Sequence, residues 1–373
     1  MARVVAIVLD GTGVGAMPDA ERFGDAPGAN TVANVAERVG GLRLPNFARL
    51  GLGNLTAIRG VAPAEQLSAS IARLSERSNG KDTITGHWEM VGIITQEAFP
   101  TYPRGFPPEV VERFTAIAGK PPLGNKAASG TEIIAELGAE HQRTGRPILY
   151  TSADSVFQVA AHEQTVPLAT LYRWCEEARA MLVPPDQVNR VIARPFEGPP
   201  DAYARTPNRR DYAVSPPINL IDRFAAQAIP VHAVGKISDI FCGRGIASSV
   251  RVVDNTDAML QTSQLLDRVH HGFIFVNLND FDTKYGHRRD VRGFADALER
   301  LDSQLPDLTA RLRSGDRVIF TADHGCDPTA PGTDHTREYV PFIELGAPNP
   351  EDLGTIVGLD QVGREAAAAL GSA

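Results

Sequence analysis

Short runs of apolar, mostly β-branched residues alternate along the chain with longer segments of mixed polarity. The clearest runs are residues 4–9, 231–234, 273–278 and 318–320. Between the last two, apolar side chains recur at helical spacing over residues 292–312, at Phe294, Ala297, Leu298, Leu301, Leu305 and Leu308. This alternation predicts parallel strands joined by crossover helices, so we expect a doubly wound α/β fold over roughly the last 160 residues.

The middle of the chain contains two proline-rich segments, residues 99–108 and 194–217, which we interpret as hinges between domains. Between them lie the strand candidates 147–150 and 188–193 and the helix candidates 130–143 and 168–182. We therefore predict a catalytic core made of residues 1–98 and 215–373, with a smaller α/β cap domain inserted at 99–214. The competing interpretation is that these prolines lie in surface loops of a single domain.

The composition favours a globular protein in a reducing compartment. Hydrophobic residues make up 43% of the 373 positions, which is enough for a packed core and excludes a disulfide miniprotein. The formal net charge of −8 opposes binding to nucleic acid or an anionic membrane, so an anionic ligand needs local cations or metal. Cys175, Cys242 and Cys326 form no CxxC pair, and the first apolar run is too short for a signal segment. We therefore expect a soluble cytoplasmic protein.

Acidic residues follow three of the four clearest runs. Asp10 follows the first, Asp280 and Asp282 follow the third, and Asp323 follows the fourth. Because the carboxyl ends of parallel strands share one edge of a sheet, we expect these acids to converge there. One aspartate at a strand end often caps the next helix, but three in equivalent positions indicate a site.

Histidines close to these acids indicate metal binding. The candidate ligands are Asp10, Asp282, His287, Asp323, His324 and His335. Carboxylates combined with imidazoles suit Mn²⁺, Zn²⁺ or Fe²⁺ better than Ca²⁺ or Mg²⁺. Six ligands are too many for one catalytic ion and natural for two, and two ions about 3.5–4 Å apart can clamp both oxygens of a phosphoryl transfer. For any one of these histidines alone, a capping or core role is the competing interpretation.

A two-metal phosphoryl site needs a nucleophile, and residues 80–89, GKDTITGHWE, offer one. Two hydroxyls, a lysine, an aspartate and two glycines are typical of a loop that presents an alcohol to a metal, which lowers the pKa of that alcohol. The spacing does not separate Thr83 from Thr85. The competing interpretation is a polar loop whose threonines cap a helix.

The glycine-rich residues 10–16 suggest a different ligand. Gly11, Gly13 and Ala16 fit the GxGxxG/A fingerprint of dinucleotide-binding sites. That fingerprint needs a second strand that ends in an acid about twenty residues later, whereas residues 30–38 have a helical pattern. We therefore do not expect a dinucleotide cofactor.

Taken together, these motifs resemble those of the phosphopentomutases of the alkaline phosphatase superfamily, which are related to the cofactor-independent phosphoglycerate mutases. The matching segments are residues 10–20, 44–46, 80–90, 150–158, 205–209, 235–237, 280–289, 321–328 and 334–338. The resemblance extends nearly from end to end. It implies an alkaline-phosphatase-like doubly wound core with an inserted smaller α/β cap domain. It also implies an isomerase that interconverts ribose 1-phosphate, or 2-deoxyribose 1-phosphate, with the corresponding 5-phosphate.

The resemblance implies roles for individual residues as well. Thr83 would carry the phosphoryl group and pass it to a sugar monophosphate, which gives a sugar bisphosphate intermediate. Two Mn²⁺ ions would be bound, one by Asp10, Asp323 and His324 and the other by Asp282, His287 and His335. The sugar hydroxyls would be read by Ser152 and Asp154, and the distal phosphate would be held by Arg190, Arg205 and Lys236, with Arg194 and Arg209 as alternatives. A cap that closes over the core would keep water from the phosphothreonine.

Three alternatives stay open. A paralogous mutase would act on a related phosphosugar, and a two-metal phosphatase or phosphodiesterase of the same fold would release its product by hydrolysis. A catalytically silent, metal-stabilised binding protein would keep the ligands without turnover. We expect a small phosphosugar as partner, with no nucleic acid and no membrane, and the sequence is compatible with a monomer.

Overall fold

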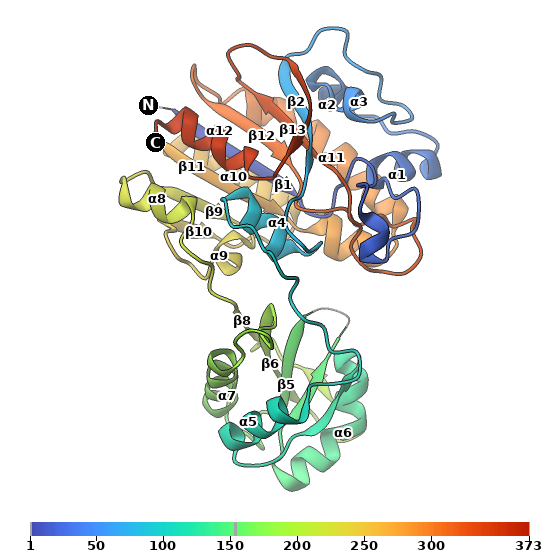
Figure 1. Cartoon of the computed structure of the whole chain (residues 1–373), viewed down its shortest axis with the longest axis vertical. Coiled ribbons are helices and arrows are strands. Elements are labelled where there is room, and N and C mark those ends of the chain that lie inside the picture. The colour runs from blue at the N-terminus through green and yellow to red at the C-terminus, as the bar shows by residue number, and fades with distance from the viewer. Residues whose placement is uncertain (1, 153–154, 373) are drawn as a thin grey trace. The chain divides into compact units, whose positions relative to one another are not determined.

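The computed structural model describes residues 2–152 and 155–372 and divides into two compact units (Figure 1). The core unit comprises residues 1–98 and 216–373, and the inserted unit comprises residues 99–215. Each unit has its own sheet and its own hydrophobic core. Among the described helices, none combines the length and the apolar character that a membrane crossing requires.

The core unit is built on a sheet of eight strands in the order β10-β9-β11-β1-β12-β13-β2-β14. The strands are β1 (Arg3–Leu9), β2 (Ala69–Ser75), β9 (Val231–Val234), β10 (Ser248–Val250), β11 (Gly272–Leu278), β12 (Arg317–Thr321), β13 (Val340–Leu345) and β14 (Asp352–Val357). β10, β9, β11, β1 and β12 are mutually parallel, whereas β13 is antiparallel to both β12 and β2. The four apolar runs are confirmed as strands β1, β9, β11 and β12, and the predicted α/β class is confirmed. The sequence did not predict β2, β13 and β14.

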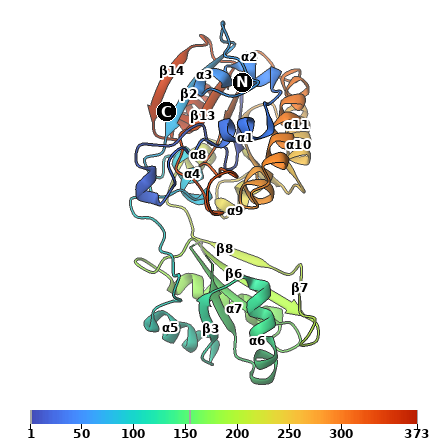
Figure 2. The same ribbon diagram turned by 90° about the vertical axis from the view of Figure 1, so that its right-hand side faces the viewer.

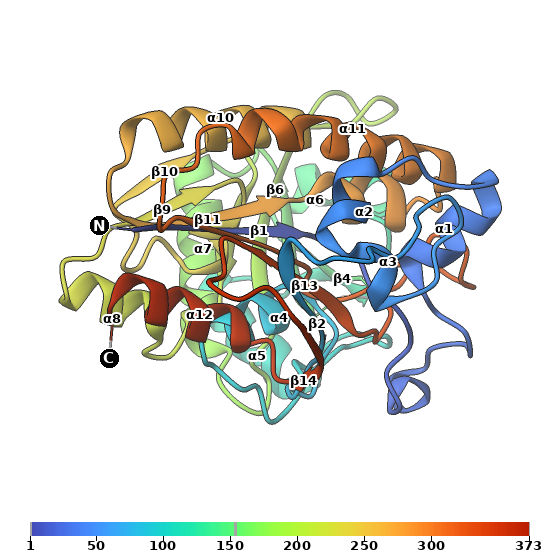
Figure 3. The ribbon, with the colours of Figure 1, turned by 90° about the horizontal axis from the view of Figure 1, so that it is seen from above.

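Helices cover both faces of this sheet, which is why β1 is buried over its whole length and has a continuous apolar sequence. Figure 3 shows α10 and α11 along one face and α4, α8 and α12 along the other. The core-unit helices are α1 (Thr31–Val39), α2 (Pro45–Leu50), α3 (Leu52–Leu55), α4 (Thr83–Met90), α8 (Leu220–Ala226), α9 (Ile237–Ile240), α10 (Asn255–Arg268), α11 (Val291–Thr309) and α12 (Gln361–Leu370). A short 3-10 helix spans Ala20–Phe23, and a π-helix spans Phe281–Gly286. The predicted crossover helix is confirmed as α11, which buries Phe294, Leu298 and Leu301.

The inserted unit has a six-stranded sheet in the order β3-β4-β5-β6-β7, in which β8 also pairs with β6. Its strands are β3 (Leu123–Ala127), β4 (Ile148–Thr151), β5 (Val156–His162), β6 (Arg190–Glu197), β7 (Ala204–Arg205) and β8 (Arg210–Ala213). Its helices are α5 (Pro108–Ala118), α6 (Gly130–Thr144) and α7 (Leu168–Met181). Two apolar clusters form its core, one with α5 and α7 and one with α6. Figures 1 and 2 show these three helices. The predicted helices 130–143 and 168–182 are confirmed.

The interpretation of residues 194–217 as a proline-rich hinge is wrong over most of that segment. β6 continues through Pro195 to Glu197, and β7 and β8 follow within the same stretch. Pro195 is tolerated because β8 pairs with β6 only up to Ala193, while β7 pairs from Phe196 onwards. The carbonyl of Pro195 faces Thr206, so its missing N–H lies on the side where the strand pairing is interrupted.

Candidate metal centre and nucleophile

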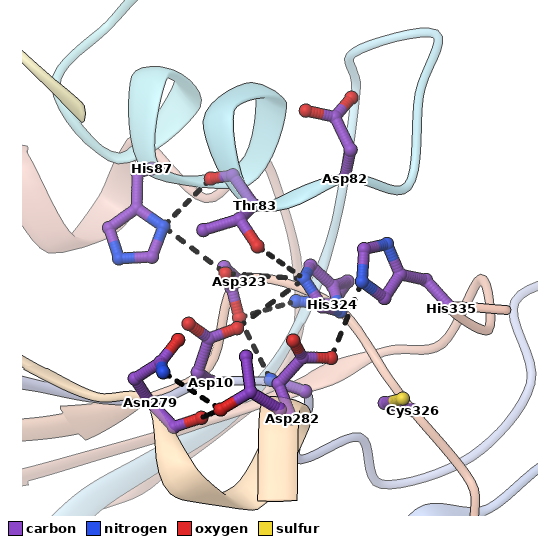
Figure 4. Close-up of polar contacts among 12 residues, drawn as sticks. Asp10, Asp82, Thr83, His87, Asn279, Asp282, Asp323, His324, Cys326 and His335 are labelled. Atoms are coloured by element: carbon purple, nitrogen blue, oxygen red, sulfur yellow. Dashed lines mark hydrogen bonds and ion pairs between the residues drawn. The ribbon is translucent and has the colours of Figure 1, made fainter. Parts of the chain in front are cut away.

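The ends of three adjacent parallel strands bring the predicted acids together. In the sheet register, Leu9 of β1 pairs with Leu278 of β11, and Val8 pairs with Thr321 of β12. Asp10 follows directly after β1, Asp323 comes two residues after the end of β12, and Asp282 lies in the π-helix after β11. All three aspartates are buried, with relative exposures of 0%, 0% and 3%. Figure 4 shows their carboxylates close to one another.

Asp10, Asp323 and His324 form one group whose ligand atoms lie within 4.8 Å of one another. Nε2 of His324 is 3.6 Å from Oδ1 of Asp10 and 3.3 Å from Oδ2 of Asp323. Nδ1 of His324 is 3.0 Å from the carbonyl oxygen of Gly325, an acceptor, so Nδ1 carries the hydrogen. The lone pair of Nε2 therefore points toward the two carboxylates.

A second group surrounds Asp282. Nε2 of His287 and Nε2 of His335 each lie 3.3 Å from Oδ1 of Asp282, and they lie 3.1 Å from one another. Nδ1 of His287 donates to the carbonyl of Thr333 at 2.6 Å, which leaves its Nε2 as the ligand atom. The ring centroids of His335 and His324 are 3.9 Å apart, so the two groups are adjacent.

The residues present fit divalent cations. Oδ1 of Asp10, Oδ1 of Asp282 and Oδ2 of Asp323 accept no hydrogen bond from the described residues, although all three are buried. A buried carboxylate oxygen without a donor is costly unless a cation compensates it. Carboxylates combined with imidazoles suit Mn²⁺, Zn²⁺ or Fe²⁺. Cys326, which sequence reasoning had set aside, also lies within 4.8 Å of ligand atoms of Asp282 and His287.

The electrostatics of the site follow from burial and crowding. Burial, together with the charges of Asp323 and Asp282, raises the pKa of Asp10 to about 8. Burial lowers the pKa of His324 to about 4, so its imidazole is neutral at neutral pH. Burial opposes ionisation of Asp282, but His335 and His287 outweigh it and hold the pKa of that carboxyl well below its usual range. A divalent cation would offset the mutual repulsion of these crowded carboxylates.

Thr83 begins helix α4 and lies beside this centre. Its Oγ1 is 3.2 Å from Nε2 of His324. Asp82 caps the helix by accepting hydrogen bonds from the N–H groups of Ile84 and Thr85, and it also accepts the hydroxyl hydrogen of Thr85 at 2.5 Å. The structure therefore places Thr83 at the metal-ligand group, while the hydroxyl of Thr85 is occupied by the cap.

The loop before Thr83 is anchored by residues that sequence reasoning did not assign. Arg337 is 3% exposed, and its Nη1 donates to the carboxylate of Glu76 at 2.6 Å and to the carbonyls of Ser78 and Gly80 at 2.8 and 2.5 Å. Lys81 forms ion pairs with Asp25 and Asp334. Arg337 comes two residues after the candidate ligand His335, and that adjacency was the available signal.

The predicted substrate-binding residues are not brought together within one unit. Lys236 caps α9 in the core unit, whereas Ser152, Arg190 and Arg205 belong to the inserted unit, and Asp154 lies outside the described residues. Arg190 is 3.6 Å from Asp211, which also pairs with Arg209 at 2.5 Å. Arg194 donates from Nε to Gln158 at 3.1 Å.

Comparison with known proteins identifies close relatives. The family model described as the Metalloenzyme superfamily matches residues 2–371. A phosphopentomutase of Anaeromyxobacter dehalogenans (strain 2CP-C) is 54% identical over 357 residues, which cover 95% of this chain and 90% of that protein. A phosphopentomutase of Symbiobacterium thermophilum is 54% identical over 373 residues, which cover 99% of this chain and 95% of that protein.

A solved structure supports the fold. A protein of Pyrococcus horikoshii has a TM-score of 0.53 with this chain at 15% identity, covering 100% of this chain and 98% of that one. At this identity the likeness concerns the fold alone. Together with the superfamily match, it confirms the predicted alkaline-phosphatase-like α/β fold, and the match also supports the use of divalent metal.

Proposed function

We propose a reaction for this chain on the basis of its family. The chain belongs to the phosphopentomutases and is therefore an isomerase that transfers phosphoryl groups. The reaction is the interconversion of ribose 1-phosphate, or 2-deoxyribose 1-phosphate, with the corresponding 5-phosphate. The observation that carries the proposal is the position of Thr83, whose Oγ1 lies 3.2 Å from Nε2 of His324. An alcohol held beside that group of ligands can accept a phosphoryl group and return it.

The proposed cycle begins with a phosphoryl group on Thr83. The free hydroxyl of a sugar monophosphate attacks the phosphorus, the bond between phosphorus and Oγ1 of Thr83 breaks, and the sugar's hydroxyl proton is transferred to the released threonine oxygen. The product of this step is a sugar bisphosphate. Thr83 then attacks the other phosphate, whose bond to the sugar breaks, and the proton moves in the opposite direction. Phosphate is conserved throughout, because water takes no part.

We propose that two divalent ions, Mn²⁺ in the first instance, are held by the two groups of ligands. Asp10, Asp323 and His324 would hold the ion beside Thr83. Asp282, His287 and His335, whose ligand atoms lie 3.1–3.3 Å apart, would hold the other. When bound, such ions offset the charge of the phosphoryl oxygens and lower the pKa of a neighbouring hydroxyl. The buried carboxylate oxygens without hydrogen bonds support this assignment.

We propose that residues 99–214 form the substrate-binding cap, because this segment carries arginines without carboxylate partners. Within the described residues, Arg194 and Arg205 form no ion pair. Burial raises the pKa of the Tyr150 hydroxyl, and the positive charges of Arg194, Arg205 and Arg209 oppose that rise. That hydroxyl is buried and has no hydrogen-bond partner among the described residues. Helix α6 begins beside it, because a Cβ on Gly130 would lie 2.6 Å from the Tyr150 hydroxyl. Guanidinium groups next to a helix N-terminus suit a phosphate.

These positions refine the proposed distal-phosphate site. Arg205 and Arg194 are better placed than Arg190, because Arg190 lies near the carboxylate of Asp211. Lys236 of the core unit stays in the proposal, as do Ser152 and Asp154 for the sugar hydroxyls. Replacement of Arg205 with Met should raise the KM for the phosphosugar more than it lowers kcat. The same substitution at Arg173, an exposed arginine paired with Glu177 on α7, is the matched control.

The deciding experiment incubates the Mn²⁺-loaded protein with ribose 1-phosphate and follows ribose 5-phosphate and free phosphate together. Ribose 5-phosphate without free phosphate, lost in Thr83→Ala and kept in Thr85→Val, is the expected result. A phosphoryl mass increment that maps to Thr83 would establish the covalent step. Free phosphate formed in step with substrate loss would instead identify a phosphatase of the same fold, and full turnover by Thr83→Ala would refute the assignment of the nucleophile.

A further inference from the structure

His87 borders the candidate metal site, although the proposed cycle does not use it. It follows Thr83 by one turn of α4, and its side chain is fully buried. Its Nδ1 is 2.8 Å from the carbonyl oxygen of Thr83 and 3.2 Å from Oδ2 of Asp323 (Figure 4). On the other edge of the ring, Nε2 is 3.1 Å from Nδ2 of Asn277, which donates to Oδ2 of Asp10 at 3.0 Å. The ring therefore connects the backbone of the nucleophile to two candidate metal ligands.

The hydrogen-bond partners assign the tautomer of this ring. A carbonyl oxygen only accepts, so Nδ1 carries the hydrogen that is donated to Thr83. Nδ2 of Asn277 donates to Oδ2 of Asp10, and the second N–H of the same NH₂ group faces Nε2 of His87. Nε2 must then be the acceptor, and both edges of the ring give the same Nδ1–H tautomer.

Donation to Thr83 also leaves Asp323 available to a cation. Oδ1 of Asp323 accepts from the N–H groups of Gly11 and His324, both at 3.1 Å, whereas Oδ2 accepts no hydrogen bond from the described residues. Gly86 permits this close packing, because a Cβ at that position would overlap the carbonyl oxygen of Asp323. Helix α4 is therefore held directly against the Asp323 segment, with the ring of His87 at the point of contact.

We propose that His87 is a positioning residue for phosphoryl transfer, in which its Nδ1–H donor fixes the first turn of α4 against Asp10 and Asp323 and so directs the hydroxyl of Thr83. The inference rests on the proposed role of Thr83 as nucleophile. Because the ring reaches the reaction only through Thr83 and the carboxylates, its loss should reduce kcat and leave the KM for the phosphosugar nearly unchanged. Outer partners of metal ligands typically contribute about 10–100-fold to activity, and small misplacements of a reacting group cost a similar factor.

The test compares three substitutions of His87. His87→Ala and His87→Gln should lower kcat by about 10–100-fold, with KM within about threefold of the parent value. His87→Asn should recover most of this loss, because its amide N–H can take the place of Nδ1–H and donate to the Thr83 carbonyl. His87→Gln places its amide nearer the position of Nε2, so it should not recover. Equal kcat values for the Asn and Gln variants would overturn the assignment of Nδ1 as the working donor.

The matched control is His141, a fully buried histidine of the inserted unit with the same bonding pattern. Its Nδ1 donates to the carbonyl of Arg146 at 2.6 Å, and its Nε2 accepts from the N–H of His162 at 2.9 Å. His141→Gln should lower the melting temperature without the drop in kcat expected for His87→Gln. An equal loss of kcat in both variants would mean that His87 acts through stability alone.

A second readout needs no substitution and remains usable if the variants fail to fold. Nitrogen-15 spectra of the histidine rings in the protein loaded with diamagnetic Zn²⁺ should show His87 with hydrogen on Nδ1. Hydrogen on Nε2 alone would overturn the proposal. Failure here is distinguishable from failure of the proposed function: if Thr83→Ala abolishes turnover while His87→Gln and His87→Ala stay within about threefold of the parent, only the positioning role is wrong.

Discussion

Replacement of Arg337 with Met tests how the nucleophile loop is held. The guanidinium forms a buried ion pair with Glu76, donates to the carbonyls of Ser78 and Gly80, and stacks on the ring of Phe23 at 4.5 Å. Oε1 of Glu76 already has no hydrogen-bond partner among the described residues. Removal of one partner of a buried pair costs about 3–5 kcal/mol, because the other charge is left uncompensated. We expect the melting temperature of the core unit to fall by roughly 10 °C.

The same substitution has a pH signature. Burial raises the pKa of Glu76, and Arg337 opposes that rise. Without Arg337, the pKa of Glu76 in the folded state lies still further above its value in the unfolded state. At pH values between these two pKa values, the folded state binds more protons than the unfolded state. Stability of the variant then decreases as pH rises. The deficit relative to the parent should be larger at about pH 8 than at about pH 5.

The assay is thermal unfolding of parent and variant at both pH values, with Arg292→Met as control. Arg292 pairs with Asp296 on the surface of α11, with 69% of its side chain exposed, so its loss should leave the melting temperature nearly unchanged. The double variant Arg337→Met with Glu76→Gln should regain part of the lost stability. If Arg337→Met unfolds within about 2 °C of the parent at both pH values, the buried pair does not anchor the loop.

Three further predictions concern the same unit. Gly86→Ala should lower kcat more than 10-fold, because its Cβ would push α4 away from Asp323. Steady-state kinetics would measure this loss beside Gly92→Ala, which strains the backbone at a φ of 91° but brings its Cβ against no neighbour. An unchanged kcat in Gly86→Ala would argue against close packing at that position. Removal of metal by a chelator should lower the melting temperature, and added Mn²⁺ should restore it in a concentration-dependent way. A melting temperature that does not change with chelator would contradict cation binding by the buried carboxylates. Arg3→Met should destabilise the core unit by about 3–5 kcal/mol, since Arg3 and Asp316 form a fully buried pair; denaturant unfolding within about 1 kcal/mol of the parent would refute this estimate.

The apolar runs predicted the centre of the sheet because both faces of those strands are covered. β1, β11 and β12 are buried at nearly every position, so their sequences are apolar without interruption and the acids after them stand out. The flanking strands gave no such signal. Pro341 interrupts β13, Arg73 lies within β2, and β14 is exposed along most of its length. Their pairing depends on neighbours that are distant in sequence.

The candidate site was predictable to the same extent. The sequence shows which metal-binding residue types lie near strand ends. The choice between Thr83 and Thr85 as the nucleophile depends on which of the two hydroxyls donates to Asp82, and that is the hydroxyl of Thr85. His87 stands in a recognisable motif, yet its partner Asn277 is 190 positions away in the chain. Such a contact requires the register of β11 against β1, which no local pattern contains.

The antiparallel strand β13 explains why ligands from a single loop reach both groups. β12 ends at Thr321 beside Asp323 and His324, and β13 returns in register, with Thr321 opposite Phe342. The intervening chain must therefore leave and re-enter the sheet at the same edge. A bridge between Gly325 and Thr336 closes this loop and places His335 next to His324. A parallel crossover from β12 would have carried the chain to the opposite edge, so the antiparallel pairing joins the two groups of ligands into one centre.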